Sequence, residues 1–178
     1  MANFRICIQN LALYNEGRHL FQWVDLPLPE SELTEICHTI ARAPRNGDGE
    51  VTAEGDEIIV VDVEGFPFKA ESGSPQRFNE WVEALEDHGE PLAAYIENLH
   101  LSPSDDPNAV ITDFADAYEG EYASEADHAE ETCRYCANIP HPLENYIDWE
   151  AVARDFRLGG DYYYLPAGGR AVYAFRNV

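Results

Sequence analysis

The 178-residue sequence predicts an α+β protein, arranged as an elongated chain of three small modules. Alternating apolar residues indicate strands near both ends of the chain, and apolar stripes at helical spacing indicate helices between them. Segments rich in proline, glycine and serine interrupt these patterns and mark boundaries. They divide the chain into an N-terminal module at residues 1–65, a helical middle module at 66–104 and a C-terminal module at 105–178.

The N-terminal module is expected to be a three-stranded sheet with one helix. Alternating Phe and Ile side chains predict a strand over residues 4–8, and further strands are expected at 19–25 and 58–63. Apolar residues of segment 33–40 recur at spacing i, i+3, i+4 and i+7, which is typical of an amphipathic helix. Three glycines in segment 45–56 predict a loop before the third strand.

Two short helices are expected in the middle module. Ser74 followed by Pro75 favours a helix start, because serine caps the helix and proline fits its first position. An apolar stripe over residues 78–85 defines the first helix, and Gly89 is expected to end it. A second stripe over residues 92–99 defines the next helix.

The C-terminal module is expected to combine helices with a β-hairpin or sheet. Apolar spacing predicts a helix over residues 111–118, and Ser124 with Asp127 forms a capping-box pattern at the start of another. A third helix is expected over residues 149–156. Two apolar runs separated by a Pro- and Gly-containing turn then predict a hairpin over residues 162–175.

The net charge of the chain is −23, from 34 acidic and 11 basic residues. Residues 78–133, called the acidic segment below, hold sixteen Asp and Glu but no Lys or Arg. Unneutralised acids repel one another and lower the stability of the folded state. We therefore expect a partner with a large positive cleft, and the commonest such cleft in a cell binds nucleic acid. The same charge argues against binding of nucleic acid or of an anionic membrane by this chain.

Helix geometry is expected to place most of these acids opposite the apolar stripes, on one surface. Acids four residues apart rise by about 6 Å along a helix, whereas duplex DNA carries one charge per ~1.7 Å of its axis. Several helices side by side could approach that density, and a homodimer with twice the charge of −23 would match about 23 base pairs. The candidate residues of this DNA-mimic surface are Glu80, Glu83, Glu86, Asp87, Glu90, Glu97, Asp113, Asp116, Glu119, Glu121, Glu125, Asp127, Glu130 and Glu131.

The sequence carries no signal for membrane insertion or secretion. No stretch approaches the roughly 18 apolar residues of a membrane span, and the N-terminus lacks a basic region followed by an apolar one. Four cysteines without a secretory context are expected to stay reduced. We therefore expect a cytoplasmic protein.

Common catalytic motifs are missing from the sequence, which has no Gly-rich nucleotide loop, no GxSxG elbow and no EF-hand pattern. We expect a protein that is not an enzyme and needs no cofactor. One metal-ligand pattern is present, because His128, Cys133, Cys136 and His141 could bind a structural zinc ion. The alternative is that both cysteines, three residues apart on a helix face, are small apolar residues.

Three consecutive tyrosines, Tyr162, Tyr163 and Tyr164, raise two further possibilities. Such side chains can stack on nucleic-acid bases. Few cations surround them in the sequence, however, so phosphate would be repelled. A tyrosine-rich subunit interface is the better interpretation.

Five segments resemble a known family. They are Leu11–Asp25 (LALYNEGRHLFQWVD), Asp62–Phe66 (DVEGF), His88–Leu99 (HGEPLAAYIENL), Phe114–Glu131 (FADAYEGEYASEADHAEE) and Asn145–Asn177 (NYIDWEAVARDFRLGGDYYYLPAGGRAVYAFRN). Together they are similar to the ArdA antirestriction proteins over nearly the whole chain. The segments 45–56 and 132–143 depart from the family pattern, and the second of them holds most of the Cys/His set.

The resemblance implies a DNA mimic carried by mobile elements, which protects incoming DNA by occupying the DNA groove of type I restriction-modification enzymes. The partner would be the specificity and modification subunits. It also implies an elongated homodimer of three-module chains, joined through the third module. The segment 146–161 corresponds to the antirestriction motif of the family, and because it lies in the third module, part of it is expected to serve dimer contact as well as activity. Its candidate residues are Tyr146, Asp148, Trp149, Glu150, Arg154, Asp155 and Asp161.

The charge pattern and the resemblance both favour competitive occupancy of a DNA site without chemistry. Three alternatives stay open at this point. The chain could be an acidic adaptor or chaperone for another basic DNA-binding protein, or a zinc-dependent enzyme centred on the Cys/His set. Acidity could also be a general property of a salt-loving host, although that hypothesis predicts evenly spread acids and here they are bunched.

Overall fold

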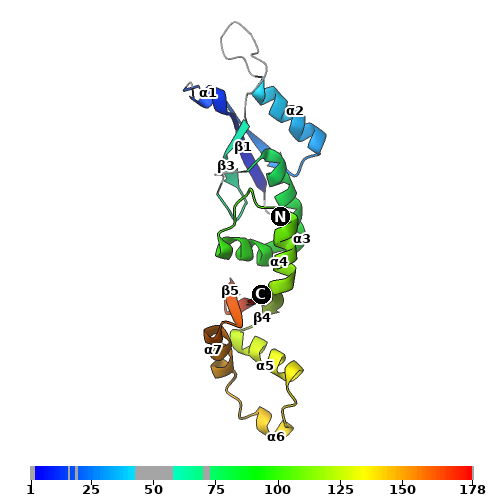
Figure 1. The fold of residues 1–178 in the computed structure, drawn as a ribbon, viewed down its shortest axis with the longest axis vertical. Helices are drawn as coiled ribbons and strands as arrows, with labels where there is room; N and C mark the ends of the chain where they lie inside the picture. The colour runs from blue at the N-terminus through cyan, green and yellow to red at the C-terminus, as the bar shows by residue number, and fades with distance from the viewer. Residues whose placement is uncertain (1–2, 16, 19, 43–57, 70–72, 178) are drawn as a thin grey trace. The chain divides into compact units, whose positions relative to one another are not determined.

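The computed structural model describes residues 3–15, 17–18, 20–42, 58–69 and 73–177. Helices and two antiparallel sheets are both present, which confirms the α+β class (Figure 1). The chain forms two compact units, which are Met1–Gly89 with Leu99–Asn108, and Glu90–Asn98 with Ala109–Val178. The division into three modules stays a prediction.

The first unit contains the expected three-stranded sheet. Its strands are β1 (Phe4–Asn10), β2 (Phe21–Leu26) and β3 (Ile58–Glu64), in the order β2-β1-β3 with antiparallel pairing throughout. A short helix, α1 (Leu11–Asn15), follows β1, and no helix was expected there from the sequence. The loop expected over residues 45–56 lies outside the described residues.

The predicted amphipathic helix is α2 (Glu30–Ala41), which packs against β1 and β3 (Figure 1). It buries Leu33, Cys37 and Ile40, as its apolar spacing predicts. Asn10 at the end of β1 is fully buried, and its amide donates to the carbonyl oxygens of Ile40 at 3.3 Å and Ala41 at 3.1 Å. These bonds satisfy the carbonyls at the end of α2 and fix the helix to the sheet.

The two helices expected in the middle module form one element, α3 (Pro75–Leu99), with a break at Gly89. Gly89 has φ 62° and ψ −148°, a conformation that only glycine adopts easily, so the predicted end of the first helix is confirmed. Before this break, Phe78, Trp81 and Val82 are fully buried. Trp81 also donates its indole N–H to the carbonyl oxygen of Pro103 at 3.1 Å.

The second unit is built on another three-stranded sheet. Its strands are β4 (Tyr118–Tyr122), β5 (Tyr162–Gly168) and β6 (Ala171–Arg176), in the order β4-β6-β5. The hairpin of β5 and β6 is confirmed. The helix expected over 111–118 is α4 (Pro107–Ala117), and it ends before Tyr118, where β4 begins. The prediction that this helix continues to Tyr118 was wrong, because Tyr118 satisfies both the helical spacing and the two-residue alternation of β4.

Three helices complete the second unit. They are α5 (Glu125–Cys136), α6 (His141–Glu144) and α7 (Trp149–Gly159). The predicted cap at Ser124 is confirmed, since Ser124 accepts the amide of Asp127 at 3.2 Å. Asp148 caps α7 in the same way, by accepting the amide of Ala151 at 3.0 Å. Among the described residues, no helix has both the length and the apolar composition that a membrane span requires.

Candidate acidic recognition surface

The first group of candidate acids lies on α3 before its break. Glu80, Glu83, Glu86 and Asp87 are all exposed, opposite the buried stripe of Phe78, Trp81 and Val82. Adjacent acids of this group are separated by one to three positions, so their backbone positions rise by about 1.5–4.5 Å along the helix axis. Within the first unit, α3 therefore presents a row of carboxylates to solvent.

Only one cation touches this row within the described residues of the first unit. Half-buried Arg77 lies 2.6 Å from a carboxylate oxygen of Glu80 and 3.5 Å from one of Asp106, and both acids are exposed. Exposed pairs of this kind contribute little stability, about 0–1 kcal/mol, and salt screens them. Glu83, Glu86 and Asp87 form no ion pair among the described residues, so their charge stays available to a partner.

In the second unit, α4 and β4 carry further acids. On α4, Asp113 and Asp116 are exposed, whereas Phe114 between them is buried with 3% exposure. On β4, Glu119 and Glu121 are exposed and alternate with half-buried neighbours. Because successive side chains of a strand point to opposite faces, both glutamates lie on the same face of β4. Glu90 and Glu97, on the part of α3 after its break, are also exposed.

The acids of α5 divide into two kinds. Glu125 and Glu130 are half-buried, and each is paired with an arginine of its own unit, Glu125 with Arg157 at 3.0 Å and Glu130 with Arg134 at 2.7 Å. A carboxylate neutralised by its own chain offers less charge to a partner. Glu131 is exposed without such a pair among the described residues, and Asp127 is exposed at the first turn of α5. The sequence alone did not separate these two kinds.

The segment 146–161 contains all of α7 and its two ends. Trp149 is half-buried and Ala153 is buried with 2% exposure, so one side of α7 packs against its own unit. The remaining candidate residues of the segment are exposed, and they are Tyr146, Asp148, Glu150, Arg154, Asp155 and Asp161. Leu158 of α7 is 76% exposed, so the outward side of this helix is both charged and apolar.

A buried histidine holds α5 against β5. His128 is fully buried, and its Nδ1 lies 2.9 Å from the phenol oxygen of Tyr164, while its Nε2 lies 3.2 Å from Oγ1 of Thr132. Burial lowers the pKa of His128 from its ordinary value of 6.5, and the nearby charges of Glu119 and Glu131 partly offset this effect. The imidazole is therefore neutral at pH 7, with both nitrogens hydrogen-bonded.

The tyrosines 162–164 pack inside their own unit. The ring of Tyr163 stacks on Phe175 with centroids 5.1 Å apart, and the ring of Tyr162 lies 5.2 Å from that of Phe156. Burial raises the pKa of both Tyr163 and Tyr164 to about 12, with smaller contributions from neighbouring groups. These contacts engage the half-buried rings within the second unit. The expectation of a tyrosine-rich subunit interface stays untested.

The structure does not bring the zinc candidates together. Both ring nitrogens of His128 are engaged with hydroxyl groups, and the side chain of His141 is 93% exposed and lies 3.3 Å from Glu144. Among the described residues, no cluster of three or more His, Cys, Asp or Glu side chains is placed to hold a metal ion. Burial, followed by the neighbouring Cys136, raises the pKa of Cys133, which opposes thiolate formation. The residues present do not fit a structural zinc ion.

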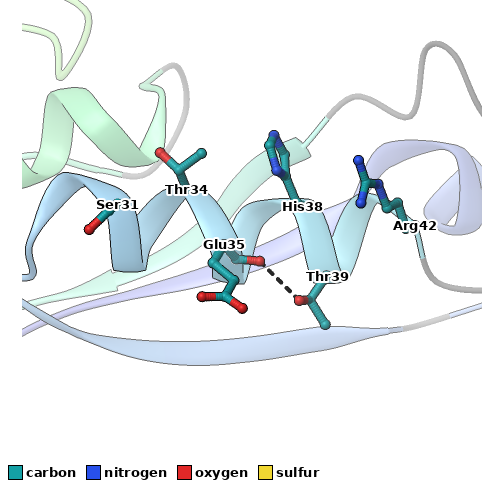
Figure 2. Close-up of a pocket in the computed structure, with 6 residues that line it drawn as sticks. All are labelled: Ser31, Thr34, Glu35, His38, Thr39 and Arg42. Atoms are coloured by element: carbon teal, nitrogen blue, oxygen red, sulfur yellow. Dashed lines mark hydrogen bonds between the residues drawn. The ribbon is translucent and has the colours of Figure 1, made fainter.

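The exposed face of α2 has a different character from that of α3. It borders a shallow hollow of about 290 Å³, lined by Ser31, Thr34, Glu35, His38, Thr39 and Arg42 (Figure 2). Hydroxyl groups, an imidazole and a guanidinium are interspersed there with the carboxylate of Glu35, and Thr39 donates to the Glu35 carbonyl at 2.9 Å. This face is mixed in charge, and it lies outside the acidic segment.

The fold and its exposed faces define an acidic α+β protein, in which the described residues include no group of three or more His, Cys, Asp or Glu placed to hold a metal ion. The model of the family described as antirestriction protein (ArdA) matches residues 6–170, so the chain belongs to the ArdA family of antirestriction proteins. No curated protein matches the chain. The family membership agrees with the resemblance seen in the sequence.

Proposed function

We propose that this antirestriction protein is a mimic of B-form DNA that occupies the DNA-binding groove of a type I restriction-modification enzyme. The observation that carries the proposal is the acidic segment, residues 78–133, in which sixteen acids stand without a Lys or Arg. Of the fourteen candidate acids, only Glu125 and Glu130 are half-buried, and the other twelve are exposed. Carboxylates in such positions could replace phosphates opposite a basic groove.

The mechanism is competitive occupancy. A groove that binds duplex DNA uses Lys and Arg side chains to neutralise phosphates, and binding releases the condensed counterions of the duplex. The exposed carboxylates of α3, α4, β4 and α5 would meet the same cations. Because these acids project from regular helices and a strand, little backbone conformational entropy is lost when they bind. No bond is formed or broken in this process.

We place the contact on the specificity and modification subunits of the enzyme, which would hold the chain in place of their duplex. The active form is taken to be a homodimer, with the exposed residues of segment 146–161 in contact either with the second chain or with the enzyme. Mobile DNA entering the cytoplasm would then escape cleavage while the enzyme is occupied. An acidic adaptor for another basic protein remains the competing function.

The proposal is tested by cleavage of an unmodified plasmid by a purified type I enzyme, with and without this protein. Inhibition should weaken steeply between about 50 and 200 mM salt, as duplex binding does. The matched control is inhibition by a short duplex carrying the recognition sequence, measured at the same salt concentrations. Inhibition that is absent, or that does not change with salt, would favour the adaptor function instead.

A further inference from the structure

Two of the four cysteines lie on the last turn of α5, three positions apart. Cys133 is half-buried and Cys136 is exposed, whereas Cys7 and Cys37 are buried in the first unit. Residues three positions apart share one face of a helix. Burial, followed by the charge of Cys136, raises the pKa of Cys133, so the two thiols lie within electrostatic reach of each other. The proposed DNA mimicry uses neither thiol.

Both thiols border the same cavity of the second unit, which has a volume of about 510 Å³. Helices α5 and α7 pack against each other beside it (Figure 1). Its other walls come from α7, from the turn that follows α7 and from the paired ends of β5 and β6, and they include Phe156, Asp161, Tyr162 and Arg176. A ligand held by both sulfur atoms therefore has room beside the helix.

Helix geometry favours an atom that bridges the two sulfurs over a direct disulfide. Cβ atoms three positions apart on a helix are about 5–6 Å from each other, whereas a disulfide requires about 3.5–4.5 Å. Oxidation would therefore have to unwind the last turn of α5, where the amide of Ala137 donates to the carbonyl oxygen of Cys133 at 2.9 Å. An atom inserted between the sulfurs spans the longer distance and leaves the helix intact.

The number and the chemistry of the donor atoms select the bridging ion. Structural zinc takes four ligands, and no third His, Cys, Asp or Glu of the described chain joins this pair in a metal-binding group. Thiolate sulfur is a soft ligand that suits Cu(I), and this ion is stable with two thiolates in a linear arrangement. Arg176 and Asp161 supply one charge of each sign to the cavity walls, so the thiol pair decides which ion is preferred.

We propose that Cys133 and Cys136 together bind one monovalent copper ion in this cavity. Two thiols and one Cu(I) give a dithiolate complex with a net charge of −1, and the two thiol protons pass to solvent. Neither the metal nor the sulfur changes its oxidation state. The bound ion would cross-link the last turn of α5 and stabilise the helix that carries Glu130 and Glu131. This site is independent of the proposed DNA mimicry, which depends on exposed carboxylates.

The experiment uses the full chain, reduced and free of oxygen, and supplies Cu(I) as its coloured complex with bicinchoninate. Loss of the colour measures transfer of copper, and one ion per chain is expected. Alkylation with iodoacetamide, followed by tryptic digestion and mass spectrometry, identifies the ligands. Trypsin cleaves after Arg134, between the two cysteines, so each thiol is measured on its own peptide. Copper should protect Cys133 and Cys136 to the same degree.

Cys133→Ala and Cys136→Ala should each lower the affinity for Cu(I) at least about 100-fold, because loss of a group that only orients a metal ligand already costs about 10–100-fold. Cys37→Ala is the matched control, since it removes a thiol from α2 and should leave the affinity unaltered. Circular dichroism verifies that all three variants fold. Inhibition of the restriction enzyme should be the same in all three, so failure of the copper site and failure of DNA mimicry are distinguishable.

Several results would overturn the proposal. They are no transfer of copper from bicinchoninate, loss of all bound copper to millimolar glutathione, and an equal effect of Cys37→Ala and Cys136→Ala. One ion for every two chains, with dimers that form only when copper is present, would assign the ion to a site shared between copies. Protection of both thiols with loss of two hydrogen atoms and no copper would assign a disulfide instead.

Discussion

Nδ1 of His128 and the phenol oxygen of Tyr164 lie 2.9 Å apart, and this hydrogen bond joins α5 to β5 inside the second unit. The bond is one of the buried contacts that hold a segment rich in acids in its folded structure. A buried imidazole, surrounded by the rings of Tyr122, Tyr162 and Phe156, anchors the helix that carries Glu130 and Glu131. Packing of this kind stabilises the unit while the carboxylates repel one another on its surface.

Replacing Tyr164 by Phe should lower the free energy of unfolding by about 1–3 kcal/mol, because it leaves a buried nitrogen of His128 without its partner. Chemical denaturation followed by circular dichroism measures this change. Tyr135→Phe is the matched control, since Tyr135 is 92% exposed and the same substitution should alter stability by less than about 0.5 kcal/mol there. Equal effects of the two substitutions would contradict the structural role of the bond.

Acidification should destabilise the second unit through His128. Burial lowers the pKa of this residue in the folded protein, so the unfolded chain, with a pKa near 6.5, binds the proton more readily. The stabilising contribution is therefore fully present above pH 6.5 and is lost as the pH falls below it. Unfolding free energies measured at several pH values between about 7.5 and 5.5 test this dependence.

The His128→Asn variant should show a flatter dependence of stability on pH over the same range than the native chain. His141→Asn is the control, because the side chain of His141 is 93% exposed and its removal should leave the native dependence nearly intact. A native pH dependence that survives in His128→Asn would show that another group causes it.

Gly89→Ala should destabilise the protein by about 1–3 kcal/mol, since an L-residue at φ 62° and ψ −148° is strained. Thermal unfolding measures the effect. Gly159→Ala provides a contrast, because Gly159 ends α7 without a positive φ, and the nearest atom to an added Cβ is the exposed Asp161 carboxylate at 3.2 Å. That substitution should change stability by no more than about 1 kcal/mol.

Neutralising three acids on α3 should weaken inhibition of the restriction enzyme by roughly tenfold or more in approximately 0.1 M salt. The variant is Glu83→Gln with Glu86→Gln and Asp87→Asn, whereas any one of these changes alone should have a small effect. A plasmid-cleavage assay at fixed salt measures inhibition.

The matched control for this variant neutralises three exposed acids of α2, Glu30, Glu32 and Glu35, which lie outside the acidic segment. It makes the same change in net charge and should retain most of the inhibition. Equal loss in the two triple variants would mean that total charge matters and not its location. Complete loss from one substitution, in a protein that still folds, would point to an enzyme.

Much of the fold follows from local patterns in the sequence. The alternation of Phe4, Ile6 and Ile8, the break at Gly89 and the cap at Ser124 each predict an element that the structure contains. These signals are strong because each involves a side chain with a specific local preference. The strand β4 was missed, because Tyr118 continues the helical spacing of α4 and its partner strand β6 lies more than fifty residues later.

The candidate site was predicted less completely. Exposure of the acids on α3 follows from their position opposite an apolar stripe. On α5, the ion pairs of Glu125 with Arg157 and of Glu130 with Arg134 do not follow from apolar spacing. The first of these joins residues 32 positions apart, so only tertiary structure reveals it. His128 was considered as a zinc ligand on its sequence spacing, and its burial against Tyr164 could not be inferred without the sheet.

The most direct test of DNA mimicry is an equilibrium competition on a purified type I methyltransferase core, which contains the specificity and modification subunits. A fluorescent duplex with the recognition sequence is bound first, and the protein is then titrated at several duplex concentrations. The account predicts complete displacement of the duplex, with the protein concentration for half-displacement rising in proportion to free duplex. A plateau of partial displacement, or a complex that holds enzyme, duplex and protein together, would contradict it.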